Sequence, residues 1–216
     1  MEINKNLRSA LAEAIGVMLF VTSIVAVNFN PTFHNVALAG TLTLMILVTA
    51  TVSGGHLNPA VSLFFFARKA ISLATLIQYW IAQLLGAFAG LYLGYSLSGA
   101  QVVAKTPPAG VSESGAFIGE VLATTVLIVF IARLASTERA SIIPFAVGIW
   151  VLVASTFTLT GAQANPAVTF ALMLRDGFTQ NHLAVVLAEI VGALIAFIYI
   201  SVLDGKPKKA KKAKKK

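Results

Sequence analysis

A ten-residue break inside a long apolar stretch constrains this chain more than any other feature. Ser53 to Ser62 reads Ser-Gly-Gly-His-Leu-Asn-Pro-Ala-Val-Ser, with strongly apolar sequence on both sides. Unpaired backbone groups are costly in hydrocarbon, so such a break must be buried in protein or must line a water-filled cavity. Asn58 is a good helix cap, and Pro59 suits the first turn of a helix. We therefore expect an extended lead-in followed by a short helix that begins near Pro59.

The same break occurs again in the second half of the chain, where Thr160 to Thr169 reads Thr-Gly-Ala-Gln-Ala-Asn-Pro-Ala-Val-Thr. Asn58 and Asn165 are separated by 107 positions, and so are Glu13 and Glu120. A matching pair of glycines further along keeps nearly the same separation, 106 positions. Agreement at three separated places indicates that the chain consists of two repeats.

Composition indicates the environment in which these repeats fold. Of the 216 residues, 57% are hydrophobic and 11% are charged, whereas a soluble domain has roughly 25% charged residues. A helix needs about 20 apolar residues to cross a bilayer. The chain has room for six such spans, and the pieces that follow the two breaks, 59–67 and 166–174, are too short to cross. We expect an all-α membrane protein of six transmembrane helices and two re-entrant half-helices.

The repeats divide the chain into four parts. We expect a first repeat over residues 1–97, a connecting loop over 98–114, a second repeat over 115–203 and a disordered basic tail over 204–216. Each repeat has three spans, an odd number, so the second copy must be inverted in the membrane relative to the first. Inverted repeats place a shared site near the membrane midplane, where discontinuous helices meet.

Basic residues gather on one side of this topology. By the positive-inside rule, that side is cytoplasmic. We therefore expect both termini to lie in the cytoplasm and the chain to lie in the cell membrane. The basic residues on the cytoplasmic side are the lysine tail, Lys5, Arg8, Arg68, Lys69, Arg133 and Arg139, and those on the other side are Lys105 and Arg175.

The formal net charge of +8 is a property of the tail. Eight lysines and no acidic residue follow Asp204, so the rest of the chain is formally neutral. We expect the tail to anchor the topology beside anionic membrane lipid, or to bind a specific lipid or partner, and we expect no nucleic acid as a partner. With no cysteine, no metal-ligand cluster and no phosphate-binding loop in the sequence, we expect no metal, no cofactor and no enzyme activity.

With two Asn-Pro-Ala triplets, Asn58-Pro59-Ala60 and Asn165-Pro166-Ala167, and a glutamate near the start of each repeat, the chain resembles the aquaporin, or major intrinsic protein, family. The resemblance covers residues 10–203. It implies two half-helices whose N-termini meet at the centre of a pore, usually in a homotetramer with one pore per subunit. Each N-terminus carries roughly half a positive charge, which opposes a cation. The carbonyls that we expect along the pore belong to Gly54, Gly55, His56, Leu57, Gly161, Gln163 and Ala164.

Three glutamates are expected inside spans, and an intramembrane acid is a functional candidate. In the aquaporin family, the first glutamate of each repeat stabilises a re-entrant loop by accepting hydrogen bonds from its backbone. The resemblance therefore implies this role for Glu13 and Glu120. Gln83 has a similar place, and Glu189 stands where the first repeat has Gln83. A proton-relay role in a coupled transporter is the alternative.

The chain departs from the family after the second motif. Aquaporins usually have arginine there, at the outer constriction, and this chain has Val168. The aspartate that is typical of glycerol facilitators is also absent. Carrying the filter positions over by spacing predicts an apolar outer filter formed by Leu38, Val153, Ala162 and Val168.

These observations predict a passive channel for water or other small neutral solutes, with ammonia and dissolved gases as candidates. Two alternatives stay open at the level of sequence. One is a proton-coupled secondary transporter, and the other is a non-conducting scaffold of the same fold.

Overall fold

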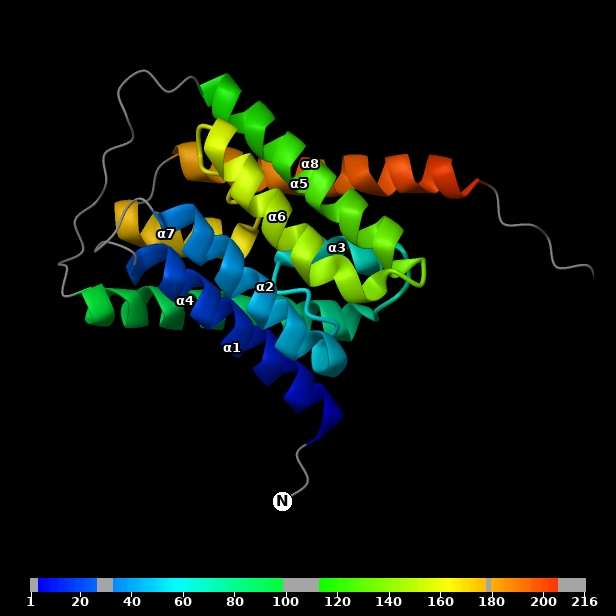
Figure 1. Ribbon diagram of the computed structural model, residues 1–216, viewed down its shortest axis with the longest axis horizontal. Helices are drawn as coiled ribbons and strands as arrows, with labels where there is room; N and C mark the ends of the chain where they lie inside the picture. Colours follow the sequence, from blue (N-terminus) through cyan, green and yellow to red (C-terminus); the bar gives the residue numbers. More distant parts are fainter. Residues whose placement is uncertain (1–3, 27–32, 99–112, 178–179, 206–216) are drawn as a thin grey trace, which may run out of the picture.

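The computed structural model describes residues 4–26, 33–98, 113–177 and 180–205 (Figure 1). Six of its helices are long and apolar enough to cross a membrane, and the described residues contain no strand. The expected all-α fold is therefore confirmed, while most of the predicted connecting loop and basic tail lies outside the described residues. The elements are α1 (Lys5–Ala26), α2 (His34–Ser53), α3 (Pro59–Ala67), α4 (Leu73–Ser98), α5 (Glu113–Ala135), the 3₁₀ turn η3 (Ala140–Ile142), α6 (Ile143–Phe157), α7 (Pro166–Asp176) and α8 (Gln180–Asp204).

Both short helices begin at the proline of an Asn-Pro-Ala triplet. Asn58 is extended, with φ of −160°, and its Oδ1 accepts from the Ala60 N–H at 2.8 Å. Asn165 repeats this cap on Ala167 at 3.1 Å. The asparagine supplies the acceptor that the first turn lacks, and the proline has no N–H to leave unpaired. The start of each short helix is therefore where the caps predict it.

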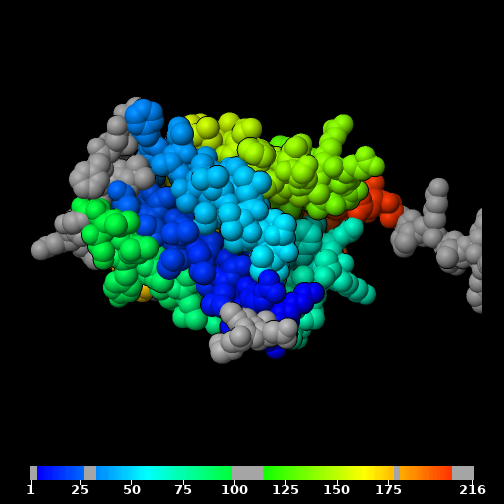
Figure 2. All heavy atoms as spheres, turned by 60° about the horizontal axis from the view of Figure 1, so that its bottom comes forward, coloured from blue at the N-terminus to red at the C-terminus, as the bar shows by residue number. Residues whose placement is uncertain are grey.

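The long helices pack in the same pairs in each repeat. α1 lies against α4 and α2 in the first repeat, and α5 lies against α8 and α6 in the second. Figure 2 shows α1 and α2 side by side across one face of the molecule. Each short helix packs on the last long helix of the other repeat as well as on that of its own, since α3 contacts α8 and α7 contacts α4. The two repeats are therefore joined through the short helices.

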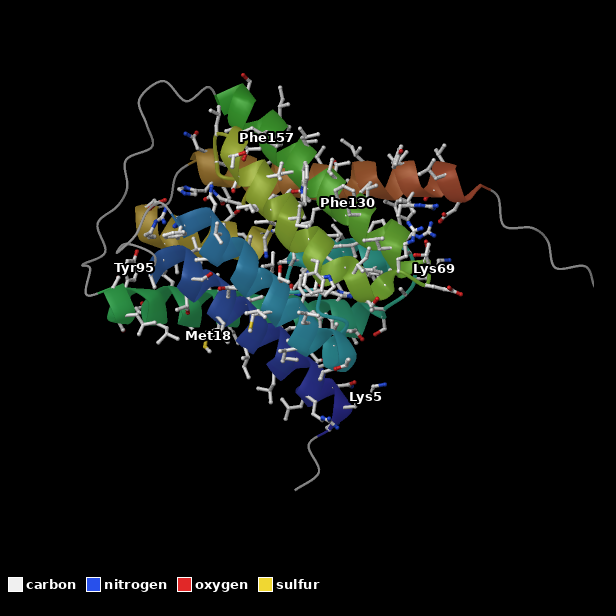
Figure 3. The ribbon with its side chains drawn as sticks, viewed as in Figure 1. Lys5, Met18, Lys69, Tyr95, Phe130 and Phe157 are labelled. Carbon is white, nitrogen blue, oxygen red and sulfur yellow. The ribbon has the colours of Figure 1, made fainter. Side chains whose placement is uncertain are left out.

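The short helices enter from opposite ends of the molecule. In Figure 1, α3 lies toward one end and α7 toward the other. Lys5 and Lys69 lie toward the α3 end in Figure 3, and Tyr95 and Phe157 lie toward the α7 end. The inverted arrangement expected from three spans per repeat therefore places the two Asn-Pro-Ala triplets face to face between these ends.

Glycines bring the paired helices into close contact. A Cβ placed on Gly86 of α4 would lie 2.2 Å from the carbonyl oxygen of Ala14 in α1. One placed on Gly192 of α8 would lie 2.8 Å from the Cβ of Thr124 and 2.9 Å from a backbone oxygen of α5. Small residues allow such backbone approach between membrane helices. The α1–α4 crossing leaves less room than its counterpart α5–α8.

Candidate functional site

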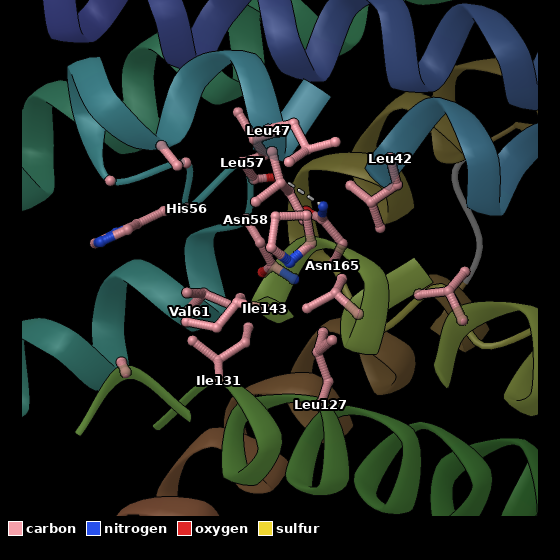
Figure 4. A pocket seen from close by; sticks show the side chains of 18 of the residues that line it. Leu42, Leu47, His56, Leu57, Asn58, Val61, Leu127, Ile131, Ile143 and Asn165 are labelled. Atoms are coloured by element: carbon pink, nitrogen blue, oxygen red, sulfur yellow. Dashed lines mark hydrogen bonds between the residues drawn. The ribbon is translucent and has the colours of Figure 1, made fainter. Parts of the chain in front are cut away.

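The two short helices meet through their capping asparagines. Asn58 Nδ2 donates to the carbonyl oxygen of Ala164 at 2.6 Å, and Asn165 Nδ2 donates to that of Leu57 at 2.8 Å (Figure 4). Each amide thus caps its own helix through Oδ1 and holds the opposite lead-in through Nδ2. An amide nitrogen carries two hydrogens. One N–H of each asparagine is used across the junction, and the other is available to the cavity that both residues line.

The lead-ins have an unusual backbone that is nearly identical in the two repeats. Leu57 and Ala164, directly before the asparagines, have φ of 49° and 45°. Gly54 and Gly161 begin the lead-ins with φ of 92° and 77°. A non-glycine residue in the left-handed region costs about 1–3 kcal/mol and persists only where the surrounding structure holds it there. The surrounding contacts must therefore hold both lead-ins in place.

Glu13 holds the first lead-in. Its Oε1 accepts from Ser53 Oγ at 2.5 Å and from the His56 N–H at 3.0 Å. Its Oε2 accepts from the Leu57 N–H at 2.6 Å and from Gln83 Nε2 at 2.8 Å. The side chain of Glu13 is fully buried. Four donors from three segments converge on this one carboxylate.

Glu120 and Glu189 divide the corresponding task in the second repeat. Glu120 accepts from Thr160 Oγ1, from the Gln163 N–H at 2.9 Å and from the Ala164 N–H at 2.7 Å. Glu189 Oε1 accepts from the next backbone N–H, that of Asn165, at 2.8 Å and from a threonine hydroxyl of α7 at 2.8 Å. Both glutamates are fully buried.

An inner cavity of about 340 Å³ opens on the α3 side of the asparagine junction. Asn58, Asn165 and His56 contribute polar groups to its wall, and Figure 4 shows apolar side chains around the two asparagines. Of the predicted carbonyl residues, Gly54, Gly55, His56, Leu57, Gln163 and Ala164 line this cavity. The carbonyls of Leu57 and Ala164 already accept from the asparagines, so they are less available to a solute than the sequence suggests. The apolar residues of the wall include Phe20, Leu42, Ile46, Val61, Leu127, Ile131 and Val147.

An outer cavity of about 220 Å³ adjoins the inner one, and both include Phe20, Val151 and Gln163 in their walls. Three residues of the predicted filter, Leu38, Ala162 and Val168, line the outer cavity, and so does Gly161, the last of the predicted carbonyl residues. The sequence-based spacing therefore brings together three of its four filter residues.

The prediction for Val153 is wrong. Its side chain is 46% exposed on the outer face of α6, and Val151 lines the outer cavity instead. A helix rotates by about 200° over two residues, so an error of two positions moves a side chain to the opposite face. The length of the loop between α6 and the second triplet cannot be read from the sequence to that precision.

Arg175 is a residue of the outer cavity that sequence reasoning missed. It follows Val168 and Leu172 at spacings of seven and three positions, so all three lie on one face of α7, and all three line the cavity. Arg175 Nε donates to Asp176 Oδ1 at 2.5 Å and Nη2 donates to Oδ2 at 2.7 Å. The helical spacing from Val168 was the signal that could have found it.

The described residues contain no group of three or more His, Cys, Asp or Glu side chains that could hold a metal ion. The candidate site therefore consists of an asparagine junction, two braced lead-ins and two adjoining cavities. Its chemistry is that of hydrogen-bond donors and dipoles along a largely apolar passage.

Known proteins resemble this chain in sequence and in fold. A model of the family described as Major intrinsic protein matches residues 1–200. The probable aquaporin TIP1-2 of Oryza sativa subsp. japonica is 35% identical in an alignment 178 residues long that covers 77% of this chain and 70% of that protein. Aquaporin TIP1-1 of Arabidopsis thaliana is 34% identical in an alignment 213 residues long that covers 88% of this chain and 84% of that protein. The X-ray structure of the aquaglyceroporin from Plasmodium falciparum has the same fold, with a TM-score of 0.76 at 24% identity over 90% of this chain and 95% of that chain. This chain therefore belongs to the major intrinsic protein family, and it is a membrane channel for water or small solutes rather than an enzyme.

Proposed function

We propose that the chain conducts water and other small neutral solutes passively through the two cavities, past Asn58 and Asn165. The observation that carries this proposal is the asparagine junction, where both amides line the inner cavity and each holds the opposite lead-in. A passing solute would meet one free N–H from each repeat at this depth.

The same junction would exclude protons and other cations. Two helix N-termini point toward it, and each carries roughly half a positive charge. A water molecule that accepts from both amides cannot pass a proton onward in both directions. In this proposal, proton exclusion depends on the helix dipoles and the asparagines, because the filter has valine where the family usually has arginine.

The proposed filter is the apolar part of the outer cavity. Leu38, Val151, Ala162 and Val168 form it, with no charged side chain among them. Such a filter offers no strong hydrogen bond to a polyol, so we propose that ammonia and dissolved gases are candidate solutes alongside water. The nearest cationic group on α7 is Arg175, which lies about 10 Å farther along the helix axis than Val168.

The two alternatives have less support. A proton-coupled transporter needs a titratable group that the solute or solvent can reach, and Glu189 is fully buried and belongs to neither cavity wall. A non-conducting scaffold needs an occluded passage, and Leu38 leaves an outer cavity of about 220 Å³.

Stopped-flow light scattering on proteoliposomes tests the proposal. Water would be measured first, followed by a panel of uncharged solutes, with protein-free liposomes of the same lipid as the control. Permeability above the control for at least one solute, without saturation and without dependence on a pH gradient, is expected. Permeability equal to the control for every solute would contradict the channel, and uptake of a non-titratable solute driven by a pH gradient would support the transporter.

We propose the cell membrane as the location, with both termini in the cytoplasm, and a homotetramer as the assembly. The one-sided distribution of basic residues supports the orientation. Reporter fusions at each terminus test the orientation and the membrane, and native mass spectrometry of the detergent-solubilised protein tests the assembly. A reporter that functions only on the outer side would contradict the orientation.

A further inference from the structure

The two repeats differ chemically at one buried position beside the lead-ins. Gln83 of α4 donates through Nε2 to Glu13 at 2.8 Å. At the equivalent place in α8, 106 positions later, the residue is Glu189, and the partner equivalent to Glu13 is Glu120. An amide–carboxylate pair in the first repeat therefore corresponds to a pair of carboxyl groups in the second.

The two carboxyl groups lie next to each other. Glu120 Oε2 accepts from the Ala164 N–H at 2.7 Å, and Glu189 Oε1 accepts from the N–H of the following residue, Asn165, at 2.8 Å. Consecutive backbone N–H groups are close in space, so the carboxyl groups that bind them must also be close. Both side chains are fully buried.

One oxygen of this pair has no donor. Glu189 Oε1 accepts from the Asn165 N–H and from Thr169 Oγ1, whereas no described residue donates to Glu189 Oε2, although that atom is buried. Gln83 Oε1 in the first repeat is also buried without a donor, but it belongs to a neutral amide. A buried oxygen without a donor costs more in a charged carboxylate than in a neutral group.

No cation in the described part of the chain compensates a second negative charge here. α8 packs against α5, α7 and α3. α3 has no titratable residue. On α7, Arg175 is paired with Asp176, two to three turns beyond the lead-in. Arg133 at the end of α5 is paired with Asp204, at the far end of α8. Glu120 is thus the titratable group that faces Glu189 from the neighbouring helices.

We propose that Glu189 is a neutral carboxylic acid that shares its proton with Glu120, and that this hydrogen bond between the two carboxyl groups takes the place of the N–H that Gln83 donates to Glu13. The two carboxyl groups then share one proton and carry one negative charge, which is also the charge of the amide–carboxylate pair. The proton stays between the two carboxyl groups, and no other group gains or loses one. Glu189 is a positioning residue, since its Oε1 holds the backbone of Asn165 and its proton holds Glu120.

This inference does not depend on what the cavities conduct, and its test requires no transport. Infrared difference spectroscopy of the purified full chain in lipid, exchanged between H₂O and D₂O, detects the C=O stretch of a protonated carboxyl group. We expect one such band at neutral pH in the wild-type protein and its loss in Glu189→Gln. Glu138→Gln is the matched control, because Glu138 is exposed in the turn after α5, and this variant should keep the band.

Absence of a protonated-carboxyl band from the wild-type spectrum would overturn the proposal. So would a band that persists unchanged in Glu189→Gln. If the Glu189→Gln protein does not fold, Glu189→Asp replaces it. A shorter acid at this position shifts the band if the band belongs to residue 189 and leaves it in place if it belongs to another residue.

Discussion

The two lead-ins have the same backbone shape but are held by different chemistry. In the first repeat, one carboxylate and one amide hold the loop, and His56 Nδ1 lies 3.1 Å from Ser62 Oγ. In the second, two carboxyl groups hold the loop, and Thr169 Oγ1 lies 2.7 Å from Gln163 Oε1. The comparison shows that the required feature is a set of acceptors facing the backbone N–H groups of the lead-in, and that the residues which complete the set can change.

The largest loss of stability is expected when the acceptor that both lead-ins share, a buried glutamate, is removed. Glu13→Leu would leave four donors without an acceptor, including the N–H groups of His56 and Leu57. Each buried unsatisfied donor costs about 1–3 kcal/mol, so we expect little folded protein, measured by detergent-solubilised yield and thermal unfolding.

Glu120→Leu provides the comparison, since it removes an acceptor from three donors in the second repeat. We expect a smaller loss of stability than in Glu13→Leu, because three donors are left without an acceptor instead of four and Glu189 would still hold Asn165. Wild-type thermal stability in either variant would show that the glutamates do not hold the lead-ins.

A smaller loss of stability is expected at the helix crossings, which are more tightly packed in the first repeat than in the second. Gly86→Ala places a methyl group against backbone atoms of α1 at 2.2 Å, whereas Gly192→Ala meets its neighbours at 2.8 Å. Overpacking of this kind costs about 1–3 kcal/mol, and we expect Gly86→Ala to lower the free energy of unfolding more than Gly192→Ala.

Gly40→Ala is the matched control, because a Cβ at Gly40 would meet nothing within 4 Å. Replacing a helix-interior glycine with alanine there should raise stability by about 0.5–1 kcal/mol. The reverse order of the three variants in thermal unfolding would contradict the packing described for α1–α4.

The valines that directly follow the two triplets lie in different cavities, and a change of solute selectivity tests this difference. Val168 lines the outer cavity and Val61 the inner one. We expect Val168→Arg to narrow the filter and to reduce the permeability of solutes larger than water by about tenfold, which corresponds to about 1.4 kcal/mol of barrier. Stopped-flow measurements on proteoliposomes check this, and unchanged selectivity would show that Val168 is not in the filter.

The smallest effect on cation leak is expected at the outer mouth. Arg175 lines the outer cavity there, whereas its counterpart in the first repeat, Arg68, lines neither cavity and pairs with Asp204. Arg175→Gln would leave Asp176 without its partner beside the outer cavity, and a negative charge there should raise the leak of cations about severalfold. Asp176→Asn should have the opposite sign, and the double variant should fall between them. Equal cation leak in all three proteoliposome preparations would remove Arg175 from the proposed conduction path.

The sequence predicts the features that local hydrogen bonding determines, such as helix starts. It does not predict the features that depend on the rotation of a helix about its axis or on contacts between distant residues. Asn58 and Pro59 predict a helix start because capping and the missing proline N–H restrict what can stand there. Val153 was misplaced because a loop of uncertain length precedes the second triplet. The sequence identifies Arg175 only as a charge on the outer side, since its position on the cavity wall depends on the direction of α7. The oxygen of Glu189 without a donor could be found only once its neighbours were placed.

The most direct test of the conduction path uses the absence of cysteine from the natural chain. Val168→Cys, Val151→Cys and Val153→Cys each introduce one thiol, and water permeability of proteoliposomes is measured before and after a small mercurial. We expect block of Val168→Cys and Val151→Cys, reversed by a reducing thiol, and no block of Val153→Cys, whose side chain faces outward. Block of Val153→Cys, with Val168→Cys and Val151→Cys unaffected, would contradict the path through the two cavities.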